Sequence, residues 1–361
     1  MSKFTSRSRV SLTLAIVLVS AVLAGCGSSS NDTKPDAGKK VVRIGFVLPD
    51  LSNPLLAEFR DGAVAAAKKR GWQVLSKGTN SAKEQSDAVL SFVAAQVDLI
   101  AIDPVDGNAM APAVKAANAA NIPVVAFQAK PASGKLATFI SPSETTAGNF
   151  MGAGAIAFCK KLAANPCEVG IVQGNPGDSS GQEENTAFEK TVGMDPSIKI
   201  VGRGTTDYDP AQALNVATNL LTAHPGMDYM YSWWDQGGAA TVAAIKSRGK
   251  LGKIGVSSQN GDCKNLQYVI NGDQYQDSVF FGSVQGALLI TTTADILDGK
   301  TMPPIVKAPV LTVTTETANQ WLDGSAKPTT DDVELGNTPL ADVTANILER
   351  LKQAQSGKCA S

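Results

Sequence analysis

The stretch 41–71 shows how hydrophobic and polar positions are organised along this chain. Its first residues form a short, mostly apolar run of the length expected of a buried parallel strand. Ser52 or Asn53 can then cap a helix, with Pro54 in the first turn, where a missing N–H costs nothing. Apolar residues recur at helical spacing up to Gly71, which predicts the end of the helix. This stretch therefore predicts a strand, a polar loop and a helix.

The same alternation continues through most of the chain. In the first half, strands are expected at 97–102, 122–127 and 138–141, and helices at 82–95, 108–120 and 145–162. In the second half, strands are expected at 168–173, 198–202, 229–232, 253–257 and 277–281, and helices at 179–191, 211–223, after 235, up to 270, and at 286–297. Residues 305–313 should be extended, with an interruption at Pro309. Residues 321–336 should be turn-rich, and 337–353 should contain an amphipathic helix. Short connections between such units predict parallel sheets, and two successive sets predict two α/β lobes.

The first 26 residues have the features of a signal segment. Three basic residues precede an apolar run, 10–22, that is too short to span a bilayer reliably. Residues 23–26, Leu-Ala-Gly-Cys, resemble a lipobox, in which Cys26 is lipidated and becomes the mature N-terminus. The alternative is an ordinary signal peptide with a chance cysteine. Residues 27–40 are rich in Gly, Ser, Lys and Asp and predict a flexible tether. We expect an exported protein, lipid-anchored in the cell membrane and facing the periplasm or cell exterior.

The charge of the chain argues against nucleic acid as a partner, and its length indicates the number of domains. The chain has 32 basic and 33 acidic residues, and removing 1–25 takes away three basic ones, which leaves 29 against 33. A net charge of about −4 provides no basic surface for nucleic acid. The remaining length suits two domains.

Cysteine usage also fits export. Apart from Cys26, the chain has Cys159, Cys167, Cys263 and Cys359, an even set for an oxidising compartment. Cys159, near a helix end, and Cys167, before a strand, are close enough in sequence to pair locally. Cys263–Cys359 would then fasten the tail to the second lobe. Four cysteines allow three pairings, and free buried thiols are the other alternative.

Motifs that carry catalytic chemistry are scarce. There is no C-x-x-C spacing and His224 is the only histidine, which argues against a zinc site or a His-based triad. The first loop, 49–54, has no glycine, so it is neither a Rossmann nor a Walker loop, and the glycine pair in 174–177 has no lysine after it. We expect no enzymatic activity, no cofactor and no metal.

The Asn-Pro pair at 53–54, followed by two apolar residues, resembles the opening of the type I periplasmic sugar-binding proteins, ribose-binding branch. The likeness extends over about 41–313. It implies two Rossmann-like lobes with parallel sheets joined by a three-stranded hinge, with 41–140 and 282–309 in the N-terminal lobe and 141–281 and 310–361 in the C-terminal lobe. It also implies a substrate-binding component of an ABC importer, whose partner is a membrane permease. We expect a monomer.

The resemblance places the ligand in the cleft between the lobes, at the carboxyl ends of strands. The family's first-loop Asn falls on Asn53, its polar residue after the second strand on Asp103, and the aromatic of its Asp-Phe-Asp motif on Tyr208. The remaining ligand-binding positions fall on Leu56, Gln128, Gln182, Trp234, Asp235, Asn260 and Phe281. Single members have simpler explanations: Leu56 as helix packing, Asp103 and Asn260 as turn residues, and Asp235 as a helix cap.

Two departures from the family pattern bear on the ligand. Its cleft arginines become Ala129 and Gln182, and its two first-loop aromatics become Leu55 and Leu56. The loss of both arginines predicts a small neutral polyhydroxylated ligand, a sugar or polyol that need not be ribose.

Three functions other than sugar binding for an importer are compatible with parts of the sequence. A sugar-responsive repressor shares the fold, but it would need a DNA-binding segment and a basic patch where this chain has the lipobox. A ligand-sensing receptor lipoprotein of the same fold and an importer component for a different small polar metabolite both remain open.

Overall fold

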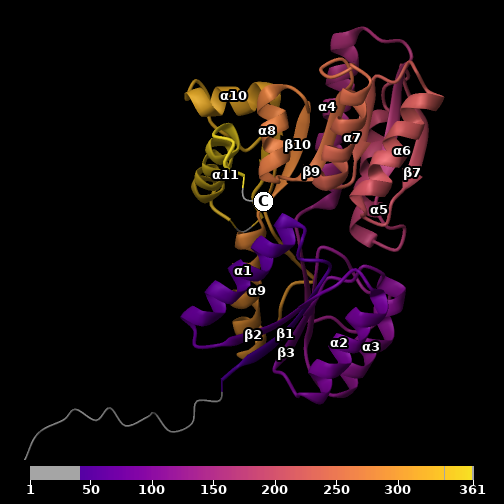
Figure 1. The fold of residues 1–361 in the computed structure, drawn as a ribbon. Coiled ribbons are helices and arrows are strands. Elements are labelled where there is room, and N and C mark those ends of the chain that lie inside the picture. Colours follow the sequence, from indigo (N-terminus) through magenta and orange to yellow (C-terminus); the bar gives the residue numbers. More distant parts are fainter. Residues whose placement is uncertain (1–40, 337, 360–361) are drawn as a thin grey trace, which may run out of the picture. The chain divides into compact units, whose positions relative to one another are not determined.

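The computed structural model describes residues 41–336 and 338–359. Two β-sheets, of six and seven strands, organise this part of the chain, and helices pack against both (Figure 1). The expected α/β class with two mostly parallel sheets is confirmed. We call the six-stranded sheet with its helices the first lobe and the seven-stranded sheet with its helices the second lobe.

The first sheet has the strand order β11-β5-β4-β3-β1-β2, and all of its pairs are parallel. Its strands are β1 (Arg43–Leu48), β2 (Gln73–Gly78), β3 (Leu99–Ile102), β4 (Val124–Phe127), β5 (Thr138–Ser141) and β11 (Ile305–Lys307). The helices of this lobe are α1 (Pro54–Lys69), α2 (Ala82–Ala94), α3 (Gly107–Ala119) and α9 (Gly282–Leu297).

The second sheet has the order β13-β12-β10-β9-β8-β6-β7 and is parallel except at β12 and β13. Its strands are β6 (Cys167–Gln173), β7 (Ile198–Thr205), β8 (Tyr229–Ser232), β9 (Gly255–Asn260), β10 (Gln276–Phe280), β12 (Val310–Thr314) and β13 (Val333–Glu334). The helices of this lobe are α4 (Glu144–Leu162), α5 (Ser179–Val192), α6 (Pro210–Ala223), α7 (Asp235–Ser247), α8 (Cys263–Asn271), α10 (Thr315–Asp323) and α11 (Leu340–Gln355).

The chain passes between the two sheets three times, which confirms the three-stranded hinge. The crossings run from β5 to α4, from β10 to α9 and from β11 to β12. The stretch 305–313, expected to be extended with an interruption at Pro309, is therefore two strands in different sheets. Pro309 lies at the break, where a residue without an N–H cannot continue a ladder. Ala308 still donates its N–H to the Ser141 carbonyl at 2.9 Å and so joins two of the crossings.

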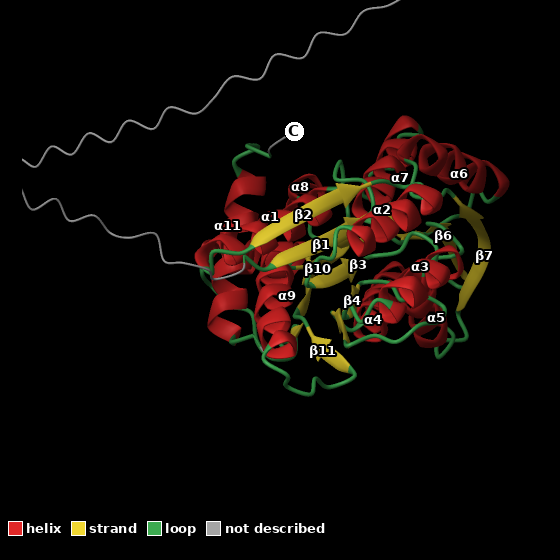
Figure 2. Cartoon of the chain, turned by 90° about the horizontal axis from the view of Figure 1, so that it is seen from below, coloured by secondary structure: helices red, strands yellow, loops and turns green. Residues whose placement is uncertain are grey.

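Helix α1 forms where the sequence predicts it. The Asn53 side chain accepts a hydrogen bond from the Leu55 N–H at 3.0 Å, and Pro54 occupies the first turn. The helix packs closely against α9, which comes from far along the chain (Figure 2). A Cβ on Gly286 would lie 2.2 Å from the Phe59 carbonyl oxygen, so only glycine permits this approach.

Weak signals explain what the sequence pattern missed. Strand β2 lies at the sheet edge, is only partly buried and contains Ser, Lys and Gly, so its apolar alternation is poor. The segment expected to be turn-rich begins with the end of α10 and includes β13.

Within the described residues, no helix has both the length and the apolar character needed to cross a membrane.

Candidate functional site

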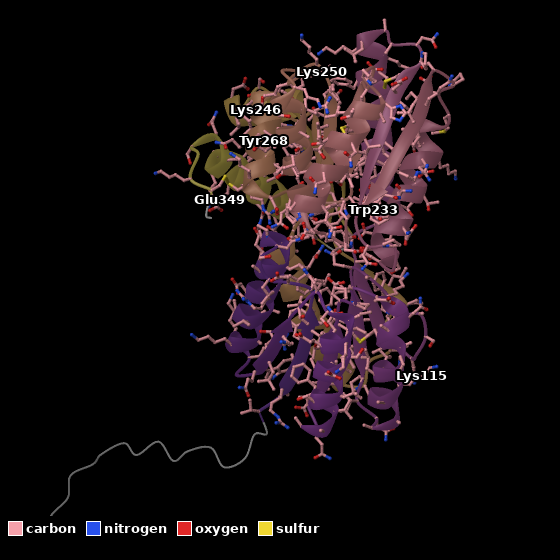
Figure 3. All side chains as sticks on the ribbon, turned by 45° about the vertical axis from the view of Figure 1, so that its right-hand side comes forward. Lys115, Trp233, Lys246, Lys250, Tyr268 and Glu349 are labelled. Carbon is pink, nitrogen blue, oxygen red and sulfur yellow. A yellow bond between two sulfur atoms is a disulfide. The ribbon has the colours of Figure 1, made fainter. Side chains whose placement is uncertain are left out.

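A cavity of about 510 Å³ lies between the lobes and is lined by residues of both. Its walls come from the segments that follow the carboxyl ends of β1, β3 and β4 in the first lobe and of β6, β7, β8 and β9 in the second. The rims also touch each other, since Lys130 donates its backbone N–H to the Ser179 hydroxyl at 2.9 Å. Figure 3 shows Trp233, one of the lining residues, at the end of the second lobe that faces the first. A volume of this size suits one small molecule.

The first lobe contributes Asn53, Leu56, Asp103 and Gln128, all predicted from the sequence. Asn53 serves at the same time as the cap of α1, and the neighbouring Leu55 also reaches the cavity. The loop that carries Asp103 is held from behind by the buried Gln85. The Gln85 amide donates to the Asp103 carbonyl and accepts from the Val105 N–H, both at 3.0 Å.

The second lobe contributes Tyr208, Trp234 and Asn260, also predicted. The rings of Tyr208 and Trp234 meet edge to face, with centroids 5.2 Å apart. The Tyr208 hydroxyl donates to the carboxylate of Asp178, a residue that also caps α5. The Trp234 indole N–H is buried and has no hydrogen-bond partner, so a donor is available to a ligand.

Backbone strain concentrates around the cavity. Gln128, Asp207, Tyr208 and Asn260 all line it, and all adopt positive φ, at 57°, 48°, 62° and 139°. Such conformations cost about 1–3 kcal/mol each for non-glycine residues and persist where the surrounding structure fixes them. The surrounding structure therefore fixes the backbone at these four positions of the cavity wall.

Asp235 does not line the cavity, contrary to the expectation from the sequence. It is the first residue of α7 and is fully buried. Its carboxylate accepts from the Ser258 hydroxyl and, at 2.6 Å, from the Asp262 N–H. Burial raises the pKa of Asp235 to about 6, against the opposing effect of these hydrogen bonds. The residue fixes the loop after β9, which carries Asn260.

Phe281 and Gln182, expected at the ligand, do not line the cavity either. Phe281 packs fully buried among apolar residues of the second lobe, and the preceding Phe280 lines the cavity instead. Adjacent side chains of an extended segment point to opposite sides, so an error of one residue in the correspondence moves the ring out of the site. Gln182 is exposed on α5 and donates to the Pro176 carbonyl at 3.3 Å, while Ser180, nearer the start of α5, lines the cavity.

Several lining residues were missed, above all Glu144 and Gln259. Glu144 follows the first hinge crossing, and Gln259 directly precedes Asn260 at the end of β9. A polar residue at the end of a buried strand was a usable signal for Gln259. No motif marked Glu144, because its place in the site depends on where the chain crosses between lobes.

The charged side chains that line the cavity are all acidic. Among the described residues, the lining includes carboxylates and no Lys, Arg or His. Burial, with the negative charge of Asp178 as the second cause, raises the pKa of Asp103 well above its ordinary value. Burial and the neighbouring Glu184 do the same for the pKa of Glu144. Within 41–336 and 338–359, no group of three His, Cys, Asp or Glu residues could hold a metal ion.

The four cysteines within the described residues do not line the cavity. The structure contains the disulfides Cys159–Cys167, with an S–S distance of 2.05 Å, and Cys263–Cys359, at 2.08 Å, the pairing expected from spacing. The second bond joins the start of α8 to the segment after α11. Cys26, the predicted lipidation site, lies outside the described residues.

Comparisons with known proteins agree with this geometry. A family model described as a periplasmic binding protein domain matches residues 44–301. The ribose import binding protein of Escherichia coli (strain K12) is 30% identical over 235 residues, which cover 64% of this chain and 75% of that protein. The ribose import binding protein of Bacillus subtilis (strain 168) is 27% identical over 277 residues, 75% of this chain and 87% of that protein.

A similar fold is found among solved structures. The periplasmic binding protein component of the arabinose ABC transporter from Shewanella sp. ANA-3, bound to alpha and beta-L-arabinofuranose, aligns with a TM-score of 0.73 at 23% identity. The alignment covers 89% of this chain and 99% of that one. At this identity the likeness concerns the fold.

Proposed function

The chain belongs to the periplasmic binding protein family, and from this premise we propose that it is the solute-binding component of an ABC importer. It captures one small polyhydroxylated molecule, a sugar or polyol, in the cavity between its lobes. The relatives that import ribose support this class of ligand, and so does the bound arabinofuranose of the Shewanella protein.

The observation that carries the proposal is the composition of the cavity. Trp233, Trp234, Tyr208 and Phe280 provide flat apolar surfaces of the kind that pack on the C–H faces of a sugar. Polar side chains such as Asn53, Asp103, Gln128, Gln259 and Asn260 line the same space and can pair with hydroxyls. A hydroxyl whose position matches them is favoured, since a buried polar group left unpaired costs about 1–3 kcal/mol.

Function on this proposal needs no chemical step. A ligand that touches both lobes favours the closed arrangement through contacts that the open one lacks. The three crossings of the hinge are short, so they allow the lobes to turn while each sheet stays intact. The membrane permease of the importer then recognises the closed form, and we expect the binding protein to act as a monomer.

The family implies export to the periplasm or cell exterior. On our proposal the chain is held there by lipid on Cys26, with 27–40 as the tether. A tethered binding protein stays close to its permease, which raises the effective concentration of one for the other.

A thermal-shift screen of sugars and polyols tests the ligand class. A ligand at about 100 times its Kd adds about 2.7 kcal/mol to the unfolding free energy. For lobes of this size that corresponds to a rise in Tm of several degrees. At least one sugar or polyol should produce it. A broad screen in which amino acids or other metabolites shift the Tm, and no sugar or polyol does, would contradict the proposal.

A further inference from the structure

The cavity wall carries an excess of negative charge that the structure does not balance. Its carboxylates are Asp50, Asp103, Glu144, Asp178, Asp207 and Asp209, and no described cationic side chain faces them across the cavity. Several of these groups have ordinary structural roles, since Asp178 caps α5 and Asp209 caps α6. An acidic lining of this kind therefore points to a ligand only if one of its members lacks a role in the fold.

Glu144 is that member. Its side chain is 3% exposed, it lines the cavity, and neither carboxylate oxygen has a hydrogen-bond partner. Other carboxylates near the lobe boundary are paired: Glu58 with Arg350, and Glu334 with Lys307 at 2.6 Å. Glu144 differs from these two acids in having no cationic partner.

The groups around Glu144 destabilise a negative charge on its carboxylate. Glu184 and Glu183 on α5, Asp178 at the start of α5 and Asp103 from the first lobe all act on it with the same sign. Glu184 is itself fully buried, and the neutral Tyr231 hydroxyl beside it supplies no positive charge. The amino end of α4 offers only about half a positive charge. A buried carboxylate with no counter-charge is costly, and a cationic group of a ligand beside Glu144 would reduce that cost.

We propose that the ligand is an amino sugar or amino polyol whose protonated amino group binds in the cavity against Glu144, with Asp103 as its second carboxylate. This inference rests on the proposed function and narrows it, because the neutral ligand expected from the missing arginines becomes a positively charged one. An ammonium group has three donors and no acceptor. Glu144 and Asp103 offer acceptors, and the Gln259 Oε1, also without a partner, offers a further one.

The aromatic lining agrees with this assignment. Trp233, Trp234, Tyr208 and Phe280 can face both C–H surfaces and a cation, since ring faces attract positive charge. Asp103 accepts only one long hydrogen bond, from the Ala129 N–H at 3.4 Å, so it has acceptor capacity left. A neutral hydroxyl could donate to Glu144, but it would leave the net charge of this wall uncompensated.

The test compares matched compounds by calorimetry and thermal shift: D-glucosamine, D-galactosamine and D-mannosamine, their N-acetyl forms, and the parent hexoses. Each set keeps the ring and changes only the substituent at one carbon, which is an ammonium, an acetamide or a hydroxyl group. We expect at least one amine to bind about tenfold or more tightly than its N-acetyl and hydroxyl counterparts, as for a charged hydrogen-bonding pair. Glu144→Gln should remove that preference, so that the amine binds within about threefold of its N-acetyl and hydroxyl counterparts.

Glu183→Gln is the matched control, because Glu183 is an exposed acid near Glu144 that does not line the cavity. It should keep the preference for the amine. If Glu144→Gln does not fold, Asp103→Asn takes its place and should weaken amine binding more than hexose binding.

The possible failures are distinct from one another. Binding of hexoses with no gain for any amine overturns this inference and leaves the proposed function standing. An amine preference that survives in Glu144→Gln, or in Asp103→Asn where that variant replaces it, overturns the assigned subsite. If none of the amines binds and no sugar or polyol raises the Tm in the wider screen, both proposals fail together.

Discussion

At the scale of single residues, buried carboxylates divide into those that hold the fold and those that face the cavity. Asp235 belongs to the first kind, because it ties the start of α7 to the Ser258 hydroxyl and the Asp262 N–H. Glu144 belongs to the second, since it lines the cavity and has no partner. We therefore expect substitution of Asp235 to affect mainly the stability of the fold, and substitution of Glu144 to affect mainly the properties of the cavity.

Replacing Asp235 should affect folding first. Asp235→Ala leaves the Ser258 hydroxyl and the Asp262 N–H, both buried, without their acceptor, and each such group costs about 1–3 kcal/mol. We expect the unfolding free energy to fall by about 2–4 kcal/mol in urea titrations. Asp207→Ala, at an exposed residue of the cavity rim, is the control and should lower it by about 1 kcal/mol or less, mainly because alanine tolerates the φ of 48° less well than aspartate. Equal stability of the two variants would refute the structural role of Asp235.

The unpaired acids also predict how stability depends on pH. Burial raises the pKa of Glu144 and Glu184 well above that of an unfolded glutamate, about 4.3. The folded chain then binds more protons than the unfolded one above that pH, so the unfolding free energy decreases as pH rises. The same sign holds for Asp103.

We therefore expect the Tm of the ligand-free protein to be lower at pH 8 than at pH 5.5. Glu144→Gln should raise the Tm at pH 8 and reduce the difference between the two pH values, because it removes one of the groups that must lose a proton. Differential scanning calorimetry across this range measures both effects. A Tm that is constant or rises from pH 5.5 to 8 would show that these acids are not buried as described.

At the scale of elements, the tail beyond the matched family segment is built into the second lobe. Helix α11 packs against α8, and Arg350 on α11 donates to the Gly261 and Phe280 carbonyls at 3.3 Å each. Arg350 also pairs with Glu58 on α1 of the first lobe. The tail therefore contacts the hinge region as well as its own lobe.

The disulfide Cys263–Cys359 should contribute most to holding this tail. It closes a loop with a sequence separation of 96, against 8 for Cys159–Cys167. In the chain-entropy account a longer loop gives more stabilisation, within a typical range of about 2–4 kcal/mol. Cys263→Ser with Cys359→Ser should lower the Tm more than Cys159→Ser with Cys167→Ser, and should expose α11 to limited proteolysis. The reverse order of Tm values would contradict this assignment.

The sequence predicts strands and helices best where burial is complete. β1 is found close to its expected position because it is a buried, mostly apolar run, and α1 and α6 because a cap, a proline and an apolar face coincide there. The half-exposed β2 was missed for lack of such a pattern. In the site, Asn53 and Trp234 could be predicted as lining residues because each directly precedes a helix that follows a buried strand. Phe281 could not, since one position decides between core and cavity, and Glu144 depends on the crossing between lobes.

At the scale of the whole molecule, the export and anchoring of the chain can be tested separately from its binding. Replacing Cys26 by Ser should release the protein from membranes, because lipidation needs the thiol while the signal segment is unchanged. Fractionation, with mass spectrometry of the N-terminal peptide, reads the result. Retention in membranes together with an unmodified N-terminal peptide would contradict the lipid anchor.

The central claim is that a small polyhydroxylated ligand binds between the lobes against Trp234, and calorimetric titration tests it most directly. The ligand is the compound with the largest effect in the thermal-shift screen, titrated into wild type, Trp234→Ala and Trp72→Ala. Trp72 is partly buried on the first lobe away from the cavity, so its loss controls for removing an indole. We predict at least about tenfold weaker binding for Trp234→Ala, about 1.4 kcal/mol, and less than about twofold for Trp72→Ala. Binding by Trp234→Ala within about twofold of wild type would contradict the account, because a ring in direct contact with the ligand cannot be that unimportant.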